Sequence, residues 1–320
     1  MTDEHCRFNE SEFQIDRARA CNIFALYELR SVIVRLVQHA RIARRATSVT
    51  RARVILGHQL VGSGPEKVIV FNDWLASCES WTPMHPYLDK TAFTYAFVDL
   101  RGYGRSIDLT GQYTFEESAQ DAFALADHLN WKRFHVVGFS MTGMLIERMV
   151  LDQPARIVSQ IAVGPVSAAG VPMAAADKSF FLSTISEDDA VRELAARICD
   201  RKLSHAWLDF KLELERATRN PKAAPHYLER WTNPRFAFAD EVAKARPAAP
   251  ILVVVGEWDH EAFLEPRMRE TYMAWHPKAE LAVIRNCGHC PMQETPVYLA
   301  TLMEAFMARN AAARSSARAA

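Results

Sequence analysis

A serine, an aspartate and a histidine, which together can carry out acyl-transfer chemistry, each follow a short apolar run of this chain. Ser140 lies in VVGFSMTG (136–143), Asp259 ends GEWD (256–259), and His289 ends NCGH (286–289). A serine hydroxyl is a weak nucleophile unless a base removes its proton during attack, and a histidine held by a carboxylate is a common base of this kind. The three residues therefore predict nucleophilic attack by serine on a carbonyl carbon.

Ser140 falls at a predicted junction between a strand and a helix. The residues before it are β-rich, and residues 144–150 have helical spacing, so the chain must turn sharply at the serine. Such a turn needs small residues two positions before and after the serine, where Gly138 and Thr142 stand. The N–H of Met141 would then lie at a helix N-terminus and could donate to a developing oxyanion. A loop serine that caps a helix would show the same local pattern.

Asp259 and His289 each follow a further predicted strand. Strand and helix patterns alternate along the chain, which predicts a mostly parallel sheet with helices on both faces. The carboxyl ends of parallel strands meet at one edge of a sheet, so we expect Ser140, Asp259 and His289 to lie close together there. Glu257, two residues before Asp259, is the alternative acid.

Composition limits the classes of protein that need to be considered. With 320 residues the chain can bury a full core, either as one domain with an insertion or as two domains. The 38 basic and 38 acidic residues cancel, so charge gives no support for a nucleic-acid partner. Six cysteines without disulfide-framework spacing, no long apolar run and no basic leader predict a cytoplasmic protein without stable membrane insertion. The oligomeric state stays open.

The pattern divides the chain into three parts. Residues 1–50 read as a basic amphipathic helix. It would be an arm that binds a membrane surface or a partner, a helix packed on the body, or an upstream extension with little order. The body, 51–310, is expected to begin with a hairpin or two antiparallel edge strands within 53–61. Residues 172–247 show helical patterns without a convincing strand, which predicts a helical lid inserted into the sheet. Residues 311–320 are expected to form a frayed tail.

The combined motifs resemble the α/β-hydrolase superfamily, in particular its lid-bearing members. The motifs that carry the resemblance are GFSMTG (138–143), DLRGYGRS (99–106), GEWD (256–259) and GHCPMQETP (288–296). The resemblance implies an α/β-hydrolase fold with a mostly parallel eight-stranded sheet and no cofactor. It also implies that Ser140 is the nucleophile, His289 the base, and Asp259 the group that orients the imidazole.

The loop after the predicted strand at 67–71 departs from this family. The family usually has His-Gly at the position where this chain has Asn72 and Asp73. An oxyanion hole needs backbone N–H groups rather than side chains, so the N–H of Trp74 is still expected to pair with that of Met141. A carboxylate at Asp73 would be unfavourable near a developing oxyanion unless it points away or is hydrogen-bonded.

Aromatic residues near the site loops are candidates for an apolar substrate pocket, although core packing would explain each of them equally well. We expect Trp74, Trp231, Trp258 and Phe139 to line this pocket. Cys287 and Cys290 have the spacing of half a zinc site, but no second ligand pair is suitably spaced, so no metal is expected.

These features predict a serine hydrolase that cleaves a carboxylic ester or lactone of a small, largely apolar substrate through an acyl-enzyme. Hydrolysis of a C–C bond, a perhydrolase reaction and cofactor-free oxygenation stay open, because the fold supports them and the choice depends on the lid and pocket. The departure at Asp73 also leaves open a non-catalytic ligand receptor on the same scaffold.

Overall fold

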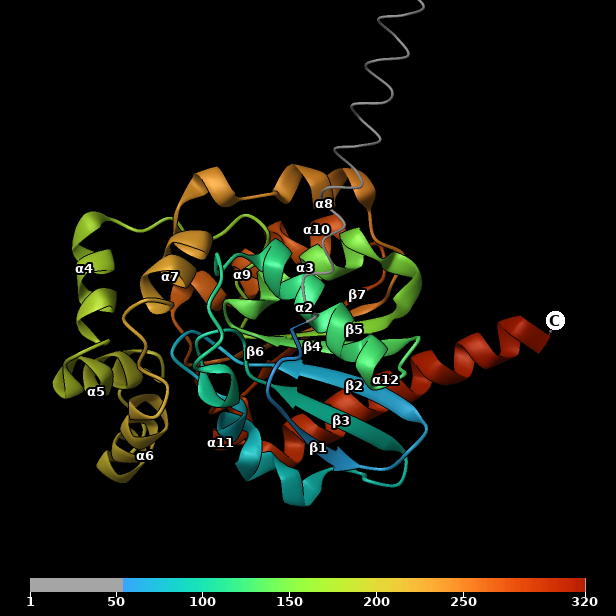
Figure 1. Cartoon of the computed structure of the whole chain (residues 1–320), viewed down its shortest axis with the longest axis horizontal. Coiled ribbons are helices and arrows are strands. Elements are labelled where there is room, and N and C mark those ends of the chain that lie inside the picture. The colour runs from blue at the N-terminus through green and yellow to red at the C-terminus, as the bar shows by residue number, and fades with distance from the viewer. Residues whose placement is uncertain (1–53, 320) are drawn as a thin grey trace, which may run out of the picture. The chain divides into compact units, whose positions relative to one another are not determined.

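The computed structural model describes residues 54–319 (Figure 1), and the helix expected within residues 1–50 lies outside them. The described chain forms a seven-stranded sheet of order β1-β3-β2-β4-β5-β6-β7. β1 runs antiparallel to β3, and all other neighbours are parallel, which confirms the predicted mostly parallel sheet. The strands are β1 (His58–Gly62), β2 (Glu66–Phe71), β3 (Phe93–Val98), β4 (Phe134–Phe139), β5 (Ile157–Val163), β6 (Ile251–Gly256) and β7 (Ala279–Ile284).

Within residues 54–319 the sheet has seven strands rather than the expected eight, and the predicted hairpin at its start is wrong. Residues 54–57 form no strand, because the backbone of Gly57 bonds elsewhere. Its N–H donates to Ser106 Oγ (2.8 Å), and its carbonyl accepts from the N–H of Asp99 (2.9 Å). β1 is consequently a single antiparallel edge strand on β3.

Helices cover both faces of the sheet. The helices of the body are α2 (Phe115–His128), α3 (Thr142–Asp152), α9 (Glu265–Glu270), α10 (Tyr272–Trp275), α11 (Pro291–Glu294) and α12 (Pro296–Ala319). Short 3-10 helices are η1 (Cys78–Tyr87), η2 (Gly104–Ser106), η3 (Pro154–Arg156) and η5 (Glu261–Phe263). α2 and α3 pack on one face and α12 on the other (Figure 1). β3, β4, β5 and β6 are therefore buried along their whole length, which explains their near-continuous apolar sequences.

The last helix does not end where the sequence suggested. α12 continues through Ala319, although a frayed tail was expected for residues 311–320. The alanine-rich sequence AAARSSARA has high helix propensity, so it extends the preceding helix instead of ending it. None of the helices in residues 54–319 combines the length and the apolar character needed to cross a lipid bilayer.

Between β5 and β6 the chain forms only helices, in a stretch that we call the helical insertion (residues 172–247). It contains α4 (Ala175–Ser183), α5 (Asp188–Arg197), α6 (His205–Arg216), α7 (Ala224–Thr232), η4 (Pro234–Phe236) and α8 (Ala239–Ala245). In Figure 1, α4 to α7 lie on the side toward which the arrowheads of β2 and β3 point, which is the carboxyl edge of the sheet. The insertion therefore stands over the edge where the predicted site residues end.

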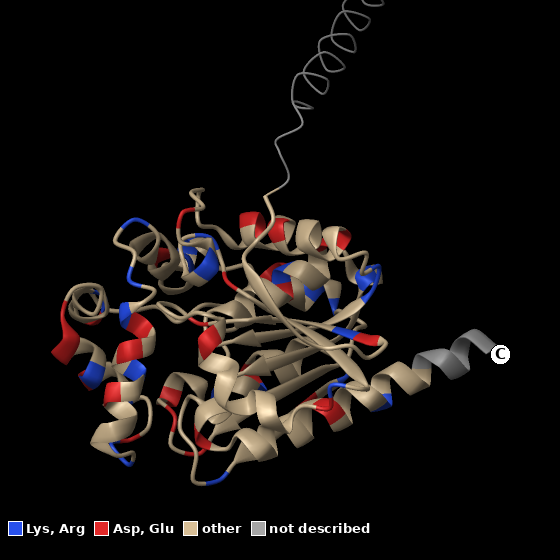
Figure 2. Cartoon of the chain, turned by 60° about the horizontal axis from the view of Figure 1, so that its bottom comes forward, with Lys and Arg blue, Asp and Glu red and all other residues tan. Residues whose placement is uncertain are grey.

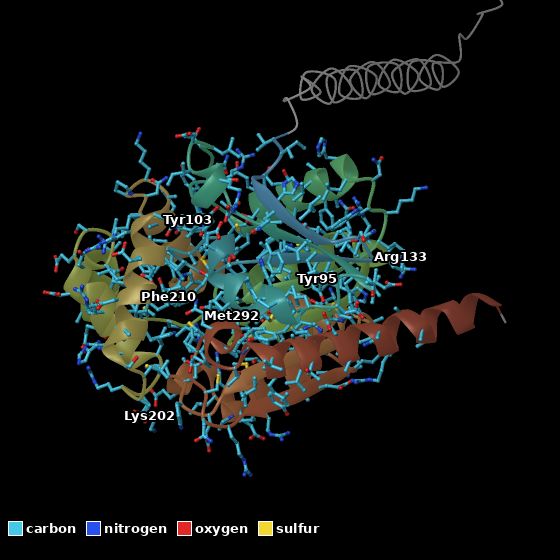
Figure 3. All side chains as sticks on the ribbon, turned by 90° about the horizontal axis from the view of Figure 1, so that it is seen from below. Tyr95, Tyr103, Arg133, Lys202, Phe210 and Met292 are labelled. Atoms are coloured by element: carbon cyan, nitrogen blue, oxygen red, sulfur yellow. The ribbon has the colours of Figure 1, made fainter. Side chains whose placement is uncertain are left out.

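Exposed ion pairs join the helices of the insertion to one another, and buried aromatic side chains join the insertion to the body. Figure 2 shows acidic and basic residues side by side on its helices, and Arg192 of α5 pairs with Asp209 of α6 at 2.9 Å. The contact with the body is less exposed. Trp74 Nε1 donates to the carbonyl of Ala224 (2.8 Å), and the ring of Tyr227 lies 5.3 Å from that of Tyr103, which Figure 3 labels beside the insertion. Because exposed pairs contribute little stability, these buried contacts fix α7 against the loops after β2 and β3.

A buried contact between a glutamate and a histidine ties α3 to the chain after α10. Glu147 Oε1 lies 3.1 Å from His276 Nε2, and neither side chain is exposed. Glu147 Oε2 accepts from the N–H of Ala168 at 2.5 Å. Burial raises the pKa of Glu147, and the hydrogen bond with His276 acts in the opposite direction. The pair positions the helix that begins directly after Ser140.

Replacing Glu147 with alanine is expected to lower the free energy of unfolding by about 3–5 kcal/mol, because His276 is then left buried without its partner. Urea denaturation followed by circular dichroism measures the change. The control is Glu241→Ala, which removes an exposed partner of Arg148 and is expected to lower the free energy by less than ~1 kcal/mol. Equal losses from the two variants would contradict the structural role of the buried pair.

Candidate active site

Ser140 lies between β4 and α3 in a left-handed backbone conformation, with φ of 52°. Residues other than glycine adopt this conformation rarely, and it persists only where the surrounding structure enforces it. The two legs of the turn touch, since a Cβ placed on Gly138 would lie 2.4 Å from the carbonyl oxygen of Thr142. Only glycine fits at this position, as the spacing of small residues had predicted.

Hydrogen bonds lock this turn onto the neighbouring strand. Thr142 Oγ1 accepts from the N–H of Phe139 and donates to its carbonyl, both at 2.8 Å. The N–H of Ser140 donates to the carbonyl of Val163 at the end of β5, and the N–H of Val166 donates to the carbonyl of Ser140, both at 2.9 Å. The serine is thereby fixed at the carboxyl edge of the sheet.

The structure brings His289 and Asp259 together at the same edge. His289 Nδ1 lies 2.7 Å from Asp259 Oδ2, and both side chains are buried. Burial lowers the pKa of His289, but the charge and hydrogen bond of Asp259 outweigh it, so the net shift is upward. The alternative acid, Glu257, is exposed and accepts from the N–H of Asn286 (2.9 Å). The geometry therefore favours Asp259 as the partner of the imidazole.

The loop that carries His289 is held by close packing and by a half-buried carboxylate, that of Glu294. A Cβ on Gly256 would lie 2.0 Å from the carbonyl oxygen of Gly288, so the end of β6 and the histidine loop pass each other at contact distance. Glu294 accepts from the N–H of Gly288 (2.6 Å) and from that of Cys290 (2.8 Å). Glu294 lies within the GHCPMQETP motif, but no sequence pattern marks it as the residue that holds this loop.

The helical insertion also holds this loop. The N–H of His289 donates to the carbonyl of Ile198, the residue after α5, at 2.9 Å. A Cβ on Gly288 would lie 2.7 Å from the Cα of Cys199, so the backbones are in contact. The insertion therefore helps to position the imidazole as well as covering it.

The two backbone N–H groups expected to form an oxyanion hole do converge, but on a protein atom. Trp74 N and Met141 N both donate to Asp73 Oδ1, at 2.6 and 3.4 Å. The other carboxyl oxygen, Oδ2, lies 4.0 Å from His289 Nε2. The side chain of the neighbouring Asn72 turns the other way and donates to the carbonyl of Val98 (2.8 Å). Asp73 thus points into the site, and hydrogen bonds hold it there.

Two cavities adjoin between the body and the insertion. The inner cavity, about 50 Å³, contains the polar residues Asp73, Ser140, Lys211, Glu215 and His289. The outer cavity is much larger, at about 610 Å³. Five apolar side chains that line both cavities form a neck between them, namely Phe181, Leu194, Ile198, Trp231 and Phe263. The polar inner cavity thus adjoins the outer cavity at a neck of apolar side chains.

Of the four residues expected to line the pocket, Trp231 lies at both cavities and Trp74 at the inner one. Phe139 and Trp258 line neither of these two cavities. Phe139 lies at the end of β4 and turns into the core, where its ring is 6.2 Å from that of Trp81. The ring of Trp258 is covered by Lys202, whose Nζ lies 5.0 Å from its centroid. Side chains alternate between the two faces of a sheet along β4, which turns Phe139 into the core. The path of the loop after β6 turns the ring of Trp258 toward Lys202.

A buried charged pair that sequence reasoning missed lines the inner cavity. Lys211 Nζ lies 3.3 Å from Glu215 Oε1, and both side chains are more than nine-tenths buried. Burial lowers the pKa of Lys211, but its acidic neighbours, Cys290 first and then Glu215 and Asp73, raise it by more, so the net shift is upward. Residues four apart with opposite charge are typical of solvated helix faces, so the sequence carried no sign that this pair is buried.

The Cys287–Cys290 spacing does not belong to a metal site in the structure. Both residues are buried free thiols. Burial raises the pKa of Cys287 to about 12 and holds that of Cys290 well above its usual range, which disfavours the thiolate form that binds metals. Within residues 54–319 no group of three or more His, Cys, Asp or Glu side chains is placed to hold a metal ion.

Comparison with known proteins agrees with this architecture. The chain belongs to the alpha/beta hydrolase family, whose model matches residues 68–302, and the resemblance stated from the sequence is thereby confirmed. A 2-hydroxy-6-oxononadienedioate/2-hydroxy-6-oxononatrienedioate hydrolase from Pseudomonas sp. is 24% identical, over 78% of this chain and 90% of its own. The uncharacterized carboxylesterase nap of Bacillus subtilis (strain 168) is 22% identical, over 75% and 79%. The enol-lactonase structure from Burkholderia xenovorans LB400 shares the fold, with TM-score 0.67, 19% identity, and coverage of 79% and 96%.

Replacing Asp259 with asparagine is expected to lower the pKa of His289, because the negative charge 2.7 Å from Nδ1 stabilises the imidazolium. Asp73→Asn should lower it by less, since the carboxyl group of Asp73 lies 4.0 Å from Nε2 and has its pKa raised by burial. NMR titration of the imidazole signals measures both shifts. Glu257→Gln is the matched control and should leave the pKa of His289 unchanged. An unchanged value in Asp259→Asn would contradict the assignment of Asp259 as the partner.

Proposed function

We propose that this protein is a serine hydrolase that cleaves a carboxylic ester or lactone through an acyl-enzyme. The observation that carries the proposal is the 2.7 Å contact between His289 and Asp259 at the edge where Ser140 stands in a strained turn. A histidine whose Nδ1–H is held by a carboxylate presents Nε2 as a base, which is what a serine nucleophile needs. Family membership supports hydrolase chemistry. The positions of Ser140, His289 and Asp259 at one edge of the sheet support the roles proposed for them.

In this proposal each of the three residues has one role. Ser140 Oγ attacks the carbonyl carbon while its proton passes to His289 Nε2. Asp259 fixes the tautomer with the proton on Nδ1 and stabilises the imidazolium that forms. The imidazolium then protonates the leaving oxygen, the carbon–oxygen bond breaks, and an ester to Ser140 remains. A water molecule repeats the sequence and releases the acid.

The two cavities support a small substrate with an apolar part. The inner cavity of about 50 Å³ has room for the reacting group alone, so the rest of the substrate must pass the apolar neck into the outer cavity. Larger pockets of several hundred cubic ångströms are typical of ligand sites, and the outer cavity falls in that range. We infer that the helical insertion acts as a lid, since it supplies Phe181 and Trp231 of the neck and would keep water from the acyl group.

A second candidate is hydrolysis of a C–C bond in a keto acid, and Lys211 is the observation that favours it. Its ammonium lines the inner cavity together with Ser140 and His289. A carboxylate or enolate oxygen of such a substrate would pair with this charge. The Pseudomonas relative acts, by its name, on oxo-dienedioates, which carry both carboxylates and a ketone. For either reaction we propose a cytoplasmic location, because the described cysteines 78, 199, 287 and 290 are free thiols.

Ser140→Ala is expected to fold normally and to lose turnover by about three powers of ten or more, since only hydrogen bonding and binding would remain. The assay is a panel of 4-nitrophenyl esters, aliphatic lactones and β-keto acids, run beside Ser63→Ala, an exposed serine in a turn. A fluorophosphonate probe should label the wild type and the control but leave the Ser140 variant unlabelled. Turnover at the wild-type rate in Ser140→Ala would overturn the mechanism, and a wild type that neither labels nor turns over any substrate would indicate a receptor.

Trp231→Ala is expected to change KM and the preference among acyl chain lengths much more than kcat. Trp231 lines the neck, where contacts are made equally by the substrate and the transition state. Steady-state kinetics with 4-nitrophenyl acetate, butyrate and octanoate measures the effect. Trp258→Ala is the matched control, since that ring lines neither cavity. If Trp231→Ala leaves the chain-length preference unchanged, the acyl group does not pass this neck.

A further inference from the structure

Asp73 stands where the family usually has glycine, and its side chain occupies the site. Its Oδ1 accepts from both N–H groups that would otherwise form the oxyanion hole, those of Trp74 and Met141. An oxygen that accepts two hydrogen bonds is the poorer place for a proton, so a neutral Asp73 carries its proton on Oδ2. That oxygen faces the reacting groups, because it lies 4.0 Å from His289 Nε2.

We propose that Asp73 is an acid catalytic residue of this site, which presents an O–H group on Oδ2 to the oxygen of the bound carbonyl. The backbone N–H groups then act through it, since they hold and polarise the carboxyl group rather than contact the substrate. The inference rests on the proposed function, because it requires Ser140 to be the nucleophile.

The surroundings of Asp73 favour its neutral form. Burial raises the pKa of Asp73, while the positive charge on His289, the N–H of Trp74, the hydroxyl of Ser140 and the charge on Lys211 act in the opposite direction, and the net shift is upward. A carboxylic acid kept neutral by a buried site can donate a strong hydrogen bond to an oxyanion, whereas a carboxylate would repel it. The ionisable groups that face Asp73 are His289, Lys211, Glu215, Tyr103 and Cys290.

The proton and electron movements balance. As the bond from Ser140 Oγ to the carbonyl carbon forms, the hydroxyl proton moves to His289 Nε2, and the π electrons of the carbonyl move to its oxygen. That oxygen takes the proton of Asp73 Oδ2, which leaves a neutral tetrahedral intermediate and an Asp73 carboxylate. On collapse the carbonyl re-forms and returns its proton to Oδ2, while the imidazolium protonates the leaving oxygen. Water repeats both transfers in the second half of the reaction.

An ionised Asp73 that merely blocks the oxyanion hole is the competing explanation, and variants at this position separate the two. Asp73→Gly restores the residue usual in the family and leaves the N–H groups free. Under the proposal it should lower kcat by about 10²–10³ with little change in KM, because the freed N–H groups can donate hydrogen bonds but cannot give the carbonyl oxygen the proton that Asp73 supplies. If Asp73 is a block, the same variant should raise kcat.

Asp73→Asn keeps the shape of the side chain and provides an amide donor that does not titrate. The wild type should show a bell-shaped dependence of kcat/KM on pH, with two apparent pKa values that belong to Asp73 and His289 as a pair. The rise reflects loss of a proton from the base, and the fall at higher pH reflects loss of the proton that the acid must donate. Asp73→Asn should retain the rise and lose the fall.

The measurements use the full chain, 4-nitrophenyl butyrate as substrate and proton release at constant pH as the signal, with circular dichroism to check the fold of each variant. Glu257→Gln is the matched acid-to-amide control and should keep the bell shape. Unchanged or increased kcat in Asp73→Gly, or a bell-shaped profile in Asp73→Asn, would overturn the proposal. If Asp73→Gly fails to fold, the pH profile of the isosteric Asn variant decides alone.

Ser140→Ala, measured in the same series, separates this inference from the function on which it rests. If that variant is inactive and the Asp73 variants behave as the wild type, the serine hydrolase stands and only the role of Asp73 fails. If Ser140→Ala keeps full activity, both fail.

Discussion

The left-handed backbone at Ser140 is the constraint on which the arrangement of the site depends. A conformation of this kind costs on the order of 1–3 kcal/mol for a non-glycine residue, so it exists only where other contacts leave the chain no alternative. Here the constraint comes from the contact of Gly138 with the carbonyl of Thr142 and from backbone bonds to β5. The turn is thus a product of the parallel sheet, because β5 is placed beside β4 by a helical crossover and not by local sequence.

The same dependence on distant structure holds for the base. The ring of His289 is oriented by Asp259, but its loop is held by Glu294 within the body and by Ile198 in the helical insertion. A lid that only covered the site could shift without consequence for the chemistry. Because the carbonyl of Ile198 accepts from the backbone N–H of His289, movement of α5 would also move the imidazole. If the insertion is the lid proposed above, its movement also changes the geometry of the proposed base.

The sequence predicted those features that depend on local pattern. Apolar runs marked the parallel strands, small residues marked the turn at Ser140, and the order of strands placed Asp259 and His289 at one edge. It could not predict features that depend on partners far along the chain. Gly57 forms no strand because its N–H bonds to Ser106, 49 residues away, and Lys211 reads as a solvated residue until its helix is packed over the cavity. Phe139 shows the same limit, since its position in the turn gave no sign that the ring enters the core.

The charged groups of the inner cavity determine what an aspartate at position 73, in place of the usual glycine, does to the site. Lys211 and Glu215 form a pair of opposite charge and cancel as a unit. Asp73 and His289 can then hold one proton between them, either as acid and imidazole or as carboxylate and imidazolium. Both states have the same net charge, but the first contains no ions within the pair, so burial favours it. In the first state the imidazole is free to accept the proton of Ser140 and the acid is ready to donate its own. In the second, the base is already occupied and the carboxylate sits where negative charge must develop. A single carboxyl group in place of glycine therefore makes reactivity depend on which of two neighbouring groups holds the proton.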